Sequence, residues 1–157
     1  MIPVLRIITG TAKGKKIETL EGDATRPTSE RIKEAIFSSI QFELENRIVL
    51  DLFAGSGQMG LEAVSCGAAT AVLCDKAKDA SAVIAKNVEK TRLGDKCTVV
   101  CADYSECIRR LAMQDKKFDL VFLDPPYDTE FSTYAKNEFE KQDQIRLCEY
   151  LKSTKAN

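Results

Sequence analysis

Four aspartates in this sequence each follow a short apolar segment, and they are the residues best suited to chemistry. They are Asp51, Asp75, Asp103 and Asp124. Short apolar runs bounded by polar residues predict buried strands. If these strands are parallel, their carboxyl ends meet at one edge of the sheet, where ligands bind in proteins of this kind. Four carboxylates at one edge would accept hydrogen bonds from the amino and hydroxyl groups of a ligand.

A glycine-rich segment follows the first of these aspartates. Gly55, Gly57 and Gly60 have the GxGxxG spacing, and Asp75 follows Gly55 by 20 residues. The flanking residues predict a strand, a turn and a helix. In this arrangement glycines let a ligand approach the backbone, and the helix N-terminus offers unpaired N–H groups. The spacing fits a dinucleotide site as well as a site for S-adenosylmethionine (SAM).

Two features favour SAM over a dinucleotide. Asp51 lies four residues before the first glycine, where a dinucleotide fold usually has an apolar residue. Its carboxylate can accept from the cationic amino group of the methionine part, whereas Asp75 is assigned to the ribose hydroxyls and Asp103 to the adenine end. The second feature is Asp124–Tyr127, for which a dehydrogenase has no use. The predicted cofactor site comprises Asp51, Phe53, Ala54, Gly55, Ser56, Gly57, Gly60, Asp75, Lys76, Asp103 and Tyr104.

The sequence Asp124-Pro125-Pro126-Tyr127 suits methylation of an exocyclic amine on a planar base. Such a nitrogen is a poor nucleophile because its lone pair is delocalised into the ring. The Asp124 carboxylate and the Pro125 carbonyl can each accept one N–H and so aim the freed lone pair at the methyl group. Pro126 stiffens the loop together with Pro125, and Tyr127 can stack on the base for about 1–3 kcal/mol. SAM supplies the electrophile, so positioning is the main task of the protein.

Local charge points to a nucleic-acid partner, although the chain as a whole has a net charge of only −1. The first 17 residues contain four cations and no acid, and two arginines lie near the start of a predicted helix. That helix end is unfavourable for a cation, which hints that the arginines serve a ligand. An exposed, solvated surface is the alternative for both groups. The predicted phosphate contacts are Arg6, Lys13, Lys15, Lys16, Arg26 and Arg31.

Alternating strands and helices predict how these residues are positioned. Residues 4–10 and a return near Ile17 predict a hairpin, and Thr28 or Ser29 is expected to cap a helix whose buried face reaches Leu44. Further strands are predicted at 47–53, 71–74, 97–102 and 118–123, and helices at 58–66, 78–92, 104–115 and 138–153. The helix at 78–92 is expected to end at a glycine stop, Leu93-Gly94-Asp95, and the helix at 138–153 is expected to follow a loop at 128–137. This order argues for a parallel sheet covered by helices on both faces.

The length of 157 residues predicts a single domain. We divide it into an N-terminal hairpin extension (1–24), a SAM-binding and catalytic core (25–127) and an atypical C-terminal loop and helix (128–157). The sequence has no run of 18 apolar residues and no apolar N-terminal stretch, so we predict no membrane span and a cytoplasmic location.

The six cysteines are interpreted as free thiols, and no metal site is predicted. The chain has no histidine and no CxxC pair. Cys97 and Cys101 fall in a predicted strand, where four residues span about 13 Å, too far for two thiolates to share a zinc ion.

Residues 5 to about 127 resemble the bacterial 16S ribosomal RNA guanine-N2 methyltransferases of the small subunit. The resemblance rests on Gly10–Lys16, Arg26–Arg31, Asp51–Ala63, Ser65–Ala68 and Asp124–Tyr127. It implies the α/β Rossmann-like sandwich of SAM-dependent methyltransferases, with a mostly parallel sheet and a small N-terminal β-hairpin. It also implies that Asp75 binds ribose, and that the substrate is a guanine in ribosomal RNA, presented on an assembling small subunit.

After Tyr127 the sequence departs from that family. The strands that complete the family's seven-stranded sheet are missing from the expected pattern, and Asp128–Phe139 resembles the corresponding segment of adenine-N6 DNA methyltransferases. Two alternatives therefore accompany the first interpretation. One is an adenine-N6 DNA methyltransferase with the same amine chemistry, and the other is a non-catalytic SAM-fold or RNA-binding module.

Overall fold

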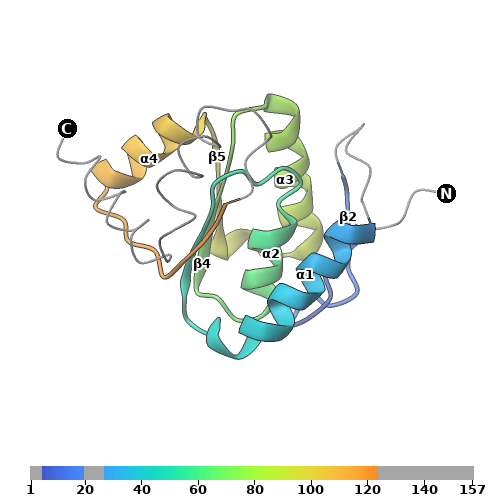
Figure 1. The fold of residues 1–157 in the computed structure, drawn as a ribbon. Helices are drawn as coiled ribbons and strands as arrows, with labels where there is room; N and C mark the ends of the chain where they lie inside the picture. Colours follow the sequence, from blue (N-terminus) through green and yellow to red (C-terminus); the bar gives the residue numbers. More distant parts are fainter. Residues whose placement is uncertain (1–4, 20–26, 124–157) are drawn as a thin grey trace.

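A four-stranded parallel sheet with helices on both faces forms the centre of the molecule (Figure 1). The computed structural model describes residues 5–19 and 27–123. The strands run in the order β5-β4-β3-β6. They are β3 (Ile48–Asp51), β4 (Thr70–Asp75), β5 (Cys97–Cys101) and β6 (Leu120–Phe122), and the helices are α1 (Pro27–Ile40), α2 (Gln58–Ser65), α3 (Lys78–Thr91) and α4 (Tyr104–Met113). The α/β sandwich expected from the sequence is confirmed.

Every pairing within this sheet is parallel, so the carboxyl ends of the strands meet at one edge. Asp51 is in register with Leu73 of β4 and Phe122 of β6, and Asp75 is in register with Cys101 of β5. The register therefore places these two acids at the carboxyl edge of the sheet, as the sequence predicted. Asp51 and Asp75 therefore occupy neighbouring strand ends.

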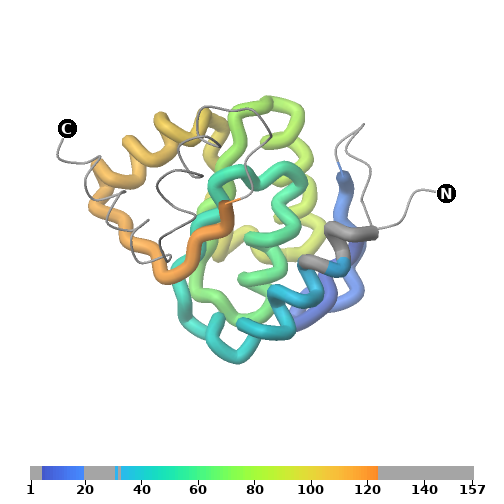
Figure 2. The backbone as a smooth tube through the Cα atoms, viewed as in Figure 1, coloured from blue at the N-terminus to red at the C-terminus, as the bar shows by residue number. Residues whose placement is uncertain are grey.

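Alternate residues of each strand point to opposite faces of the sheet and build two cores. Val49 and Leu73 pack with residues of α1, α2 and α3, whereas Leu50 and Val72 pack with α4. This two-residue alternation is the geometry of an extended chain. Figures 1 and 2 show the same layers, with α4 on one side of the strands and the other three helices on the opposite side. The predicted loop at 128–137 and the predicted helix at 138–153 lie outside the described residues.

A separate antiparallel hairpin, β1 (Leu5–Arg6) with β2 (Lys16–Ile17), packs against α2. Its loop is bonded to Ser65 at the end of that helix, because Thr11 N donates to Ser65 O (2.9 Å) and Ala12 N to Ser65 Oγ (2.9 Å). Gly10 adopts φ +80°, and a Cβ atom there would lie 1.7 Å from Ser65 O. The hairpin can approach α2 this closely only because residue 10 has no side chain.

A buried ion pair reinforces that contact. Glu62 of α2 accepts from Ile8 N (2.9 Å), Thr9 N (3.0 Å) and Thr9 Oγ1 (3.0 Å). Lys33 of α1 lies 3.6 Å from the Glu62 carboxylate and donates to Arg6 O (2.9 Å), and these two side chains are 1% and 0% exposed. Burying charges is costly unless they are paired and hydrogen-bonded, as here. The hairpin, α1 and α2 therefore form one packed unit.

Three boundary predictions were wrong. Helix α1 begins at Pro27, so Thr28 and Ser29 lie inside it instead of capping it; proline suits the first helical turn because its missing N–H has no intrahelical partner there. Leu44 is buried but lies beyond α1. Helix α3 ends at Thr91, close to the predicted end, but the predicted glycine stop is wrong, because the C-cap is Arg92 with a left-handed φ of 59° and Gly94 belongs to the short helix η2 (Gly94–Lys96).

The hairpin strands are shorter than the predicted 4–10 segment because the chain turns to meet α2 from Ile8 onward. Cys97 and Cys101 lie in β5 as predicted. The described cysteines are free thiols, namely Cys66, Cys74, Cys97, Cys101 and Cys107; Cys148 lies outside the described residues. None of the described helices is long and apolar enough to cross a membrane.

We predict that Gly10→Ala destabilises the protein by about 3 kcal/mol, because the new methyl group would overlap the Ser65 carbonyl. Gly14→Ala is the matched control, since Gly14 has φ +86° but no described atom within 4 Å of the added Cβ. It should cost only about 1–2 kcal/mol from backbone strain. Urea unfolding of both variants checks this. Equal losses would show that the contact with Ser65 is unimportant.

Candidate functional site

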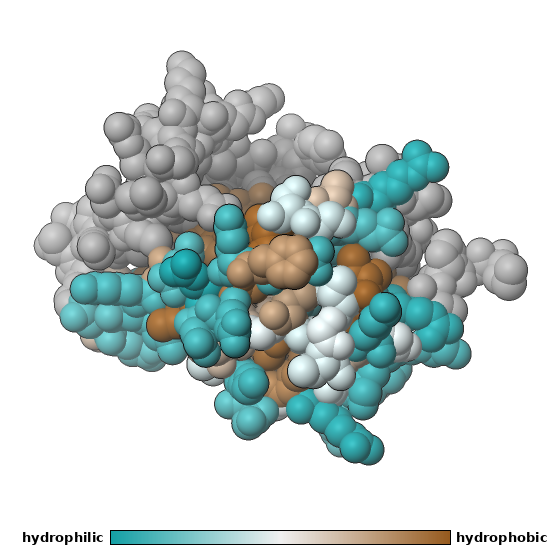
Figure 3. Space-filling model, turned by 90° about the horizontal axis from the view of Figure 1, so that it is seen from below, coloured by the Kyte–Doolittle hydropathy of each residue, from teal (hydrophilic) through white to brown (hydrophobic). Residues whose placement is uncertain are grey.

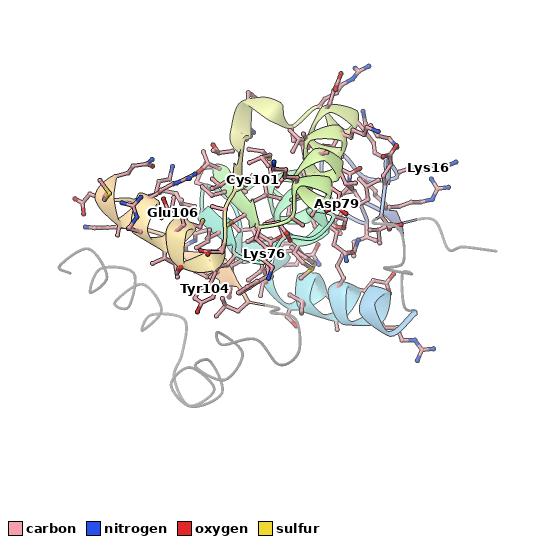
Figure 4. The ribbon with its side chains drawn as sticks, turned by 90° about the horizontal axis from the view of Figure 1, so that it is seen from above. Lys16, Lys76, Asp79, Cys101, Tyr104 and Glu106 are labelled. Atoms are coloured by element: carbon pink, nitrogen blue, oxygen red, sulfur yellow. The ribbon has the colours of Figure 1, made fainter. Side chains whose placement is uncertain are left out.

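The carboxyl edge of the sheet carries the described residues of the predicted cofactor site. Figure 4 looks down on this edge, where Tyr104 lies at α4, Lys76 lies near the middle of the view, and Lys16 extends outward from the hairpin beyond α3. The opposite edge, seen in Figure 3, presents hydrophobic residues rimmed by hydrophilic ones. The polar groups predicted to bind a ligand are at the carboxyl edge, where Asp51 and Asp75 end neighbouring strands.

The glycine segment forms a tight turn that starts α2. Gly57 N donates to Ala54 O (2.7 Å), and Ala54 N donates to Cys74 O of β4 (2.9 Å). Gly57 is the N-cap of α2 with φ 85°, a conformation that L-residues with side chains rarely adopt. A Cβ atom at Gly60 would lie 2.8 Å from the side chain of Leu73. The GxGxxG spacing thus serves the turn and the close packing of α2 on β4.

Asp51 ties the end of β3 to the first turn of α2. Its Oδ2 atom accepts from Gly60 N (3.1 Å), and the residue is only 3% exposed. The contact of Asp51 with the amino group of a cofactor stays a prediction. The structure shows a structural role, because the carboxylate satisfies one of the N–H groups that a helix start leaves without an intrahelical partner.

Asp75 holds the glycine turn from the neighbouring strand. Its Oδ2 atom accepts from Gly55 N (3.0 Å), and Oδ1 accepts from Ala77 N (3.0 Å). The carboxylate is half-buried, and the adjacent Lys76 is exposed. Among the described residues, no atom lies within 4 Å of where a Cβ at Gly55 would be, so they leave this side of the turn open. Asp75 therefore braces the glycine turn, and its predicted contact with a ribose stays a prediction.

Asp103 is the N-cap of α4. Its Oδ1 atom accepts from Glu106 N (2.8 Å) and Ser105 Oγ (2.9 Å). These bonds favour the ionised form, the first more than the second, and lower the pKa of the Asp103 carboxyl. Helix capping accounts for an acid at this position without any ligand. The predicted contact of Asp103 with adenine stays a prediction.

An aromatic pair lies between the end of β3 and the start of α4. The ring of Phe53 is 5.9 Å from that of Tyr104, and the planes are inclined by 41°. Both residues are half-buried. Tilted pairs at this separation are favourable, so the pair joins the end of β3 to the start of α4 and puts aromatic rings at this edge of the sheet.

The predicted basic residues of the hairpin lie together, as expected. Arg6, Lys13 and Lys16 are exposed and Lys15 is half-buried, and Arg6 Nη1 donates to Gly14 O (3.1 Å). Arg31 is exposed on α1. Two groups of predicted site residues lie outside the described part of the chain, namely Arg26 and Asp124, Pro125, Pro126 and Tyr127.

Four buried polar residues that hold the site together were not predicted from the sequence, namely Lys33, Glu62, Ser65 and Asn87. A signal existed for Glu62, which lies in the run Leu61–Ser65 where every residue is buried. A charged residue within an apolar helical stretch indicates a buried partner. Over residues 5–19 and 27–123, no cluster of three or more histidine, cysteine or acidic side chains could hold a metal ion.

The fold, with a glycine turn held by two carboxylates, is the Rossmann-like fold of SAM-dependent methyltransferases. The SAM-dependent methyltransferase of Agrobacterium tumefaciens has a similar fold, with a TM-score of 0.56 and 23% identity over 65% of this chain and 33% of that one. Hypothetical protein TTHA0928 of Thermus thermophilus resembles the chain more strongly, with a TM-score of 0.72 and 30% identity over 85% of this chain and 75% of that one.

The chain belongs to the family described as Conserved hypothetical protein 95, whose sequence model matches residues 5–155. It is similar to ribosomal RNA small subunit methyltransferase D of Escherichia coli (strain K12), with 33% identity over 123 residues. That match covers 78% of this chain and 60% of the relative, so the chain spans less than two thirds of the relative's length. The family resemblance noted in the sequence is confirmed.

We expect Asp103→Ala to lower the melting temperature at pH 7 by about 3 °C through loss of the α4 cap. The folded-state pKa of Asp103 is lowered. The contribution of its charge is therefore complete above the unfolded-state pKa of about 4 and is lost as the pH falls through the folded-state value. Melting curves of both proteins from pH 7 to pH 2 should converge in acid. A difference that stays constant would contradict a charged cap.

Proposed function

We propose that this protein is a SAM-dependent methyltransferase that modifies the exocyclic amine of a nucleobase, and that its substrate is guanine N2 in 16S ribosomal RNA. One observation carries the cofactor part of the proposal. The carboxylates of Asp51 and Asp75 bond to Gly60 N and Gly55 N, so that two acids flank one glycine turn. This pair suits a ligand with a cationic amino group at one end and ribose hydroxyls at the other.

The residues of the edge fit SAM in three ways. Asp51 lies at the end of β3, where it would meet the amino group, Asp75 at the end of β4 would meet the ribose beside Gly55, and Phe53 with Tyr104 would offer aromatic contact to adenine. When bound, SAM supplies a methyl group on a sulfonium cation. The chain's own residues then orient both reactants and exclude water, which is where most of the rate acceleration of such a reaction arises.

The amine-binding part of the proposal rests on sequence. Asp124 and Pro125 would accept the two N–H groups of the base, and Tyr127 would stack on its face. These residues follow β6, which runs parallel to β3 and ends at Phe122, in register with Asp51. The approach of a paired base requires that it leave its helix. A ribosomal RNA substrate would place the reaction in the cytoplasm.

The choice of ribosomal RNA is supported by the small subunit methyltransferase that the chain resembles and by the basic hairpin. The hairpin carries Arg6, Lys13, Lys15 and Lys16 on a body tied to α2, so its cations hold a fixed place relative to the glycine turn. Phosphate contacts of this kind position a nucleic acid without reading its sequence.

The direct test is calorimetry with SAM followed by methyl-transfer assays on 16S ribosomal RNA, small ribosomal subunits and DNA. We expect SAM binding, transfer to RNA or subunits, and a methyl group mapped to guanine N2. Transfer to adenine in DNA alone would support the adenine-N6 alternative. SAM binding without transfer to any substrate would support a non-catalytic module.

The role proposed for Asp124 has its own test. Asp124→Ala should reduce transfer at least about 100-fold, in line with the loss of a group that positions the reacting nitrogen, and should leave SAM affinity within about twofold. Asp95→Ala in η2 is the control, because this exposed acid lies at the start of β5, away from the carboxyl edge. Retained transfer in Asp124→Ala would rule out the proposed role.

The hairpin can be tested through salt dependence. We predict that Lys15→Glu with Lys16→Glu weakens RNA binding and flattens the slope of log K against log salt by about one unit for each lost phosphate contact. Lys116→Glu with Lys117→Glu, between α4 and β6, is a charge-matched control expected to keep the slope. An unchanged slope in the hairpin variant would assign Lys15 and Lys16 to a merely solvated surface.

A further inference from the structure

Asn87, in the middle of α3, is a fully buried amide whose hydrogen bonds join two distant segments. Its Nδ2 atom donates to Glu18 O (2.9 Å) and to Ser56 O (2.8 Å), and its Oδ1 atom accepts from Glu18 N (2.7 Å). The residue is 0% exposed. Both N–H groups of the amide and its oxygen therefore have partners, as a buried amide requires. One side chain connects the hairpin to the glycine turn.

On the hairpin side, Asn87 binds both main-chain polar groups of one residue. Glu18 directly follows β2, and its N–H and C=O groups both bond to the Asn87 amide. Buried backbone groups need such partners. The other end of the hairpin is bonded to Glu62 and Ser65 of α2. Lys15 and Lys16 thus lie in the chain between the segment bonded to α2 and Glu18, which is bonded to Asn87. In Figure 4, α3 lies between the hairpin and the strand ends.

On the cofactor side, Asn87 orients the peptide unit between Ser56 and Gly57. The C=O and N–H groups of a trans peptide point in opposite directions. Because Ser56 O is directed at Asn87, Gly57 N is directed the other way, where it donates to Ala54 O (2.7 Å). That bond closes the turn that Asp75 holds through Gly55. Asn87 therefore fixes the shape of the turn from its buried side.

We propose that Asn87 is a positioning residue that sets the glycine turn and the basic hairpin in one geometry, so that cofactor affinity and RNA affinity both depend on it. The choice of SAM and RNA as ligands rests on the proposed function. The hydrogen bonds from Asn87 to Glu18 and Ser56 are present in the free protein. Asn87 touches no reacting atom. Its loss should raise KM for both SAM and RNA by about tenfold, the value of one or two buried hydrogen bonds, and change kcat much less.

The first measurement is hydrogen–deuterium exchange of the ligand-free protein, comparing the natural chain with Asn87→Ser. Exchange should accelerate both at Glu18 and across Ala54–Gly57. Thr91→Val is the matched control: Thr91 is also buried in α3, but its Oγ1 atom bonds only to Asn87 O and Val88 O of the same helix among the contacts described. Faster exchange at one segment only, or equally in the control, would overturn the proposed tie.

The second measurement separates this inference from the proposed function. Calorimetry with S-adenosylhomocysteine and filter binding with a 16S ribosomal RNA transcript should show weaker binding of both to Asn87→Ser, and binding within about twofold of the natural chain for Thr91→Val. If the natural chain bound neither ligand, the proposed function would be wrong. The exchange measurement would still show whether Asn87 holds both segments in place. Unchanged affinities in a folded Asn87→Ser protein would overturn the positioning role.

Discussion

The buried carboxylate of Glu62 is the interaction on which the arrangement of the site depends. It lies in α2, the helix that the glycine turn starts, and it accepts from the backbone of Ile8 and Thr9 while paired with Lys33 of α1. Leaving either charge buried without its partner would cost about 3–5 kcal/mol. The hairpin and α1 therefore cannot be moved relative to α2 without a large loss. The basic residues of the hairpin and the glycine turn are therefore both held in place by α2.

A second group of hydrogen bonds fixes the glycine turn itself. Asp51 and Asp75 hold its amides from the strand ends, and Asn87 holds its carbonyl from the opposite side. Gly55 and Gly57 adopt positive φ values of 59° and 85° and have no side chains with which to hold the turn. It is shaped instead by polar groups on three different elements. Such preorganisation is what a binding turn needs, because order present before binding costs no affinity.

The sequence predicted the order and type of the elements well, and their ends less well. The strands ending at Asp51 and Asp75 and the helix after Gly57 follow from apolar runs and glycine spacing, which are local signals. The start of α1 at Pro27 was missed, and so was the C-cap of α3, which is Arg92 and not a glycine. Capping preferences are worth about 1 kcal/mol, and packing of the whole helix easily overrides them.

Local sequence was enough to predict that a parallel sheet brings Asp51 and Asp75 to one edge beside a glycine turn. Apolar strand segments and glycine spacing can both be recognised from residues that are close together in the sequence. What holds that edge in place emerged only from the packed fold. Glu62 binds residues 54 and 53 positions away, and Asn87 binds Glu18 across 69 positions. Periodicity reports which face of a helix is buried. It does not report which distant backbone groups a buried polar side chain will meet, since that depends on how the packed elements come together.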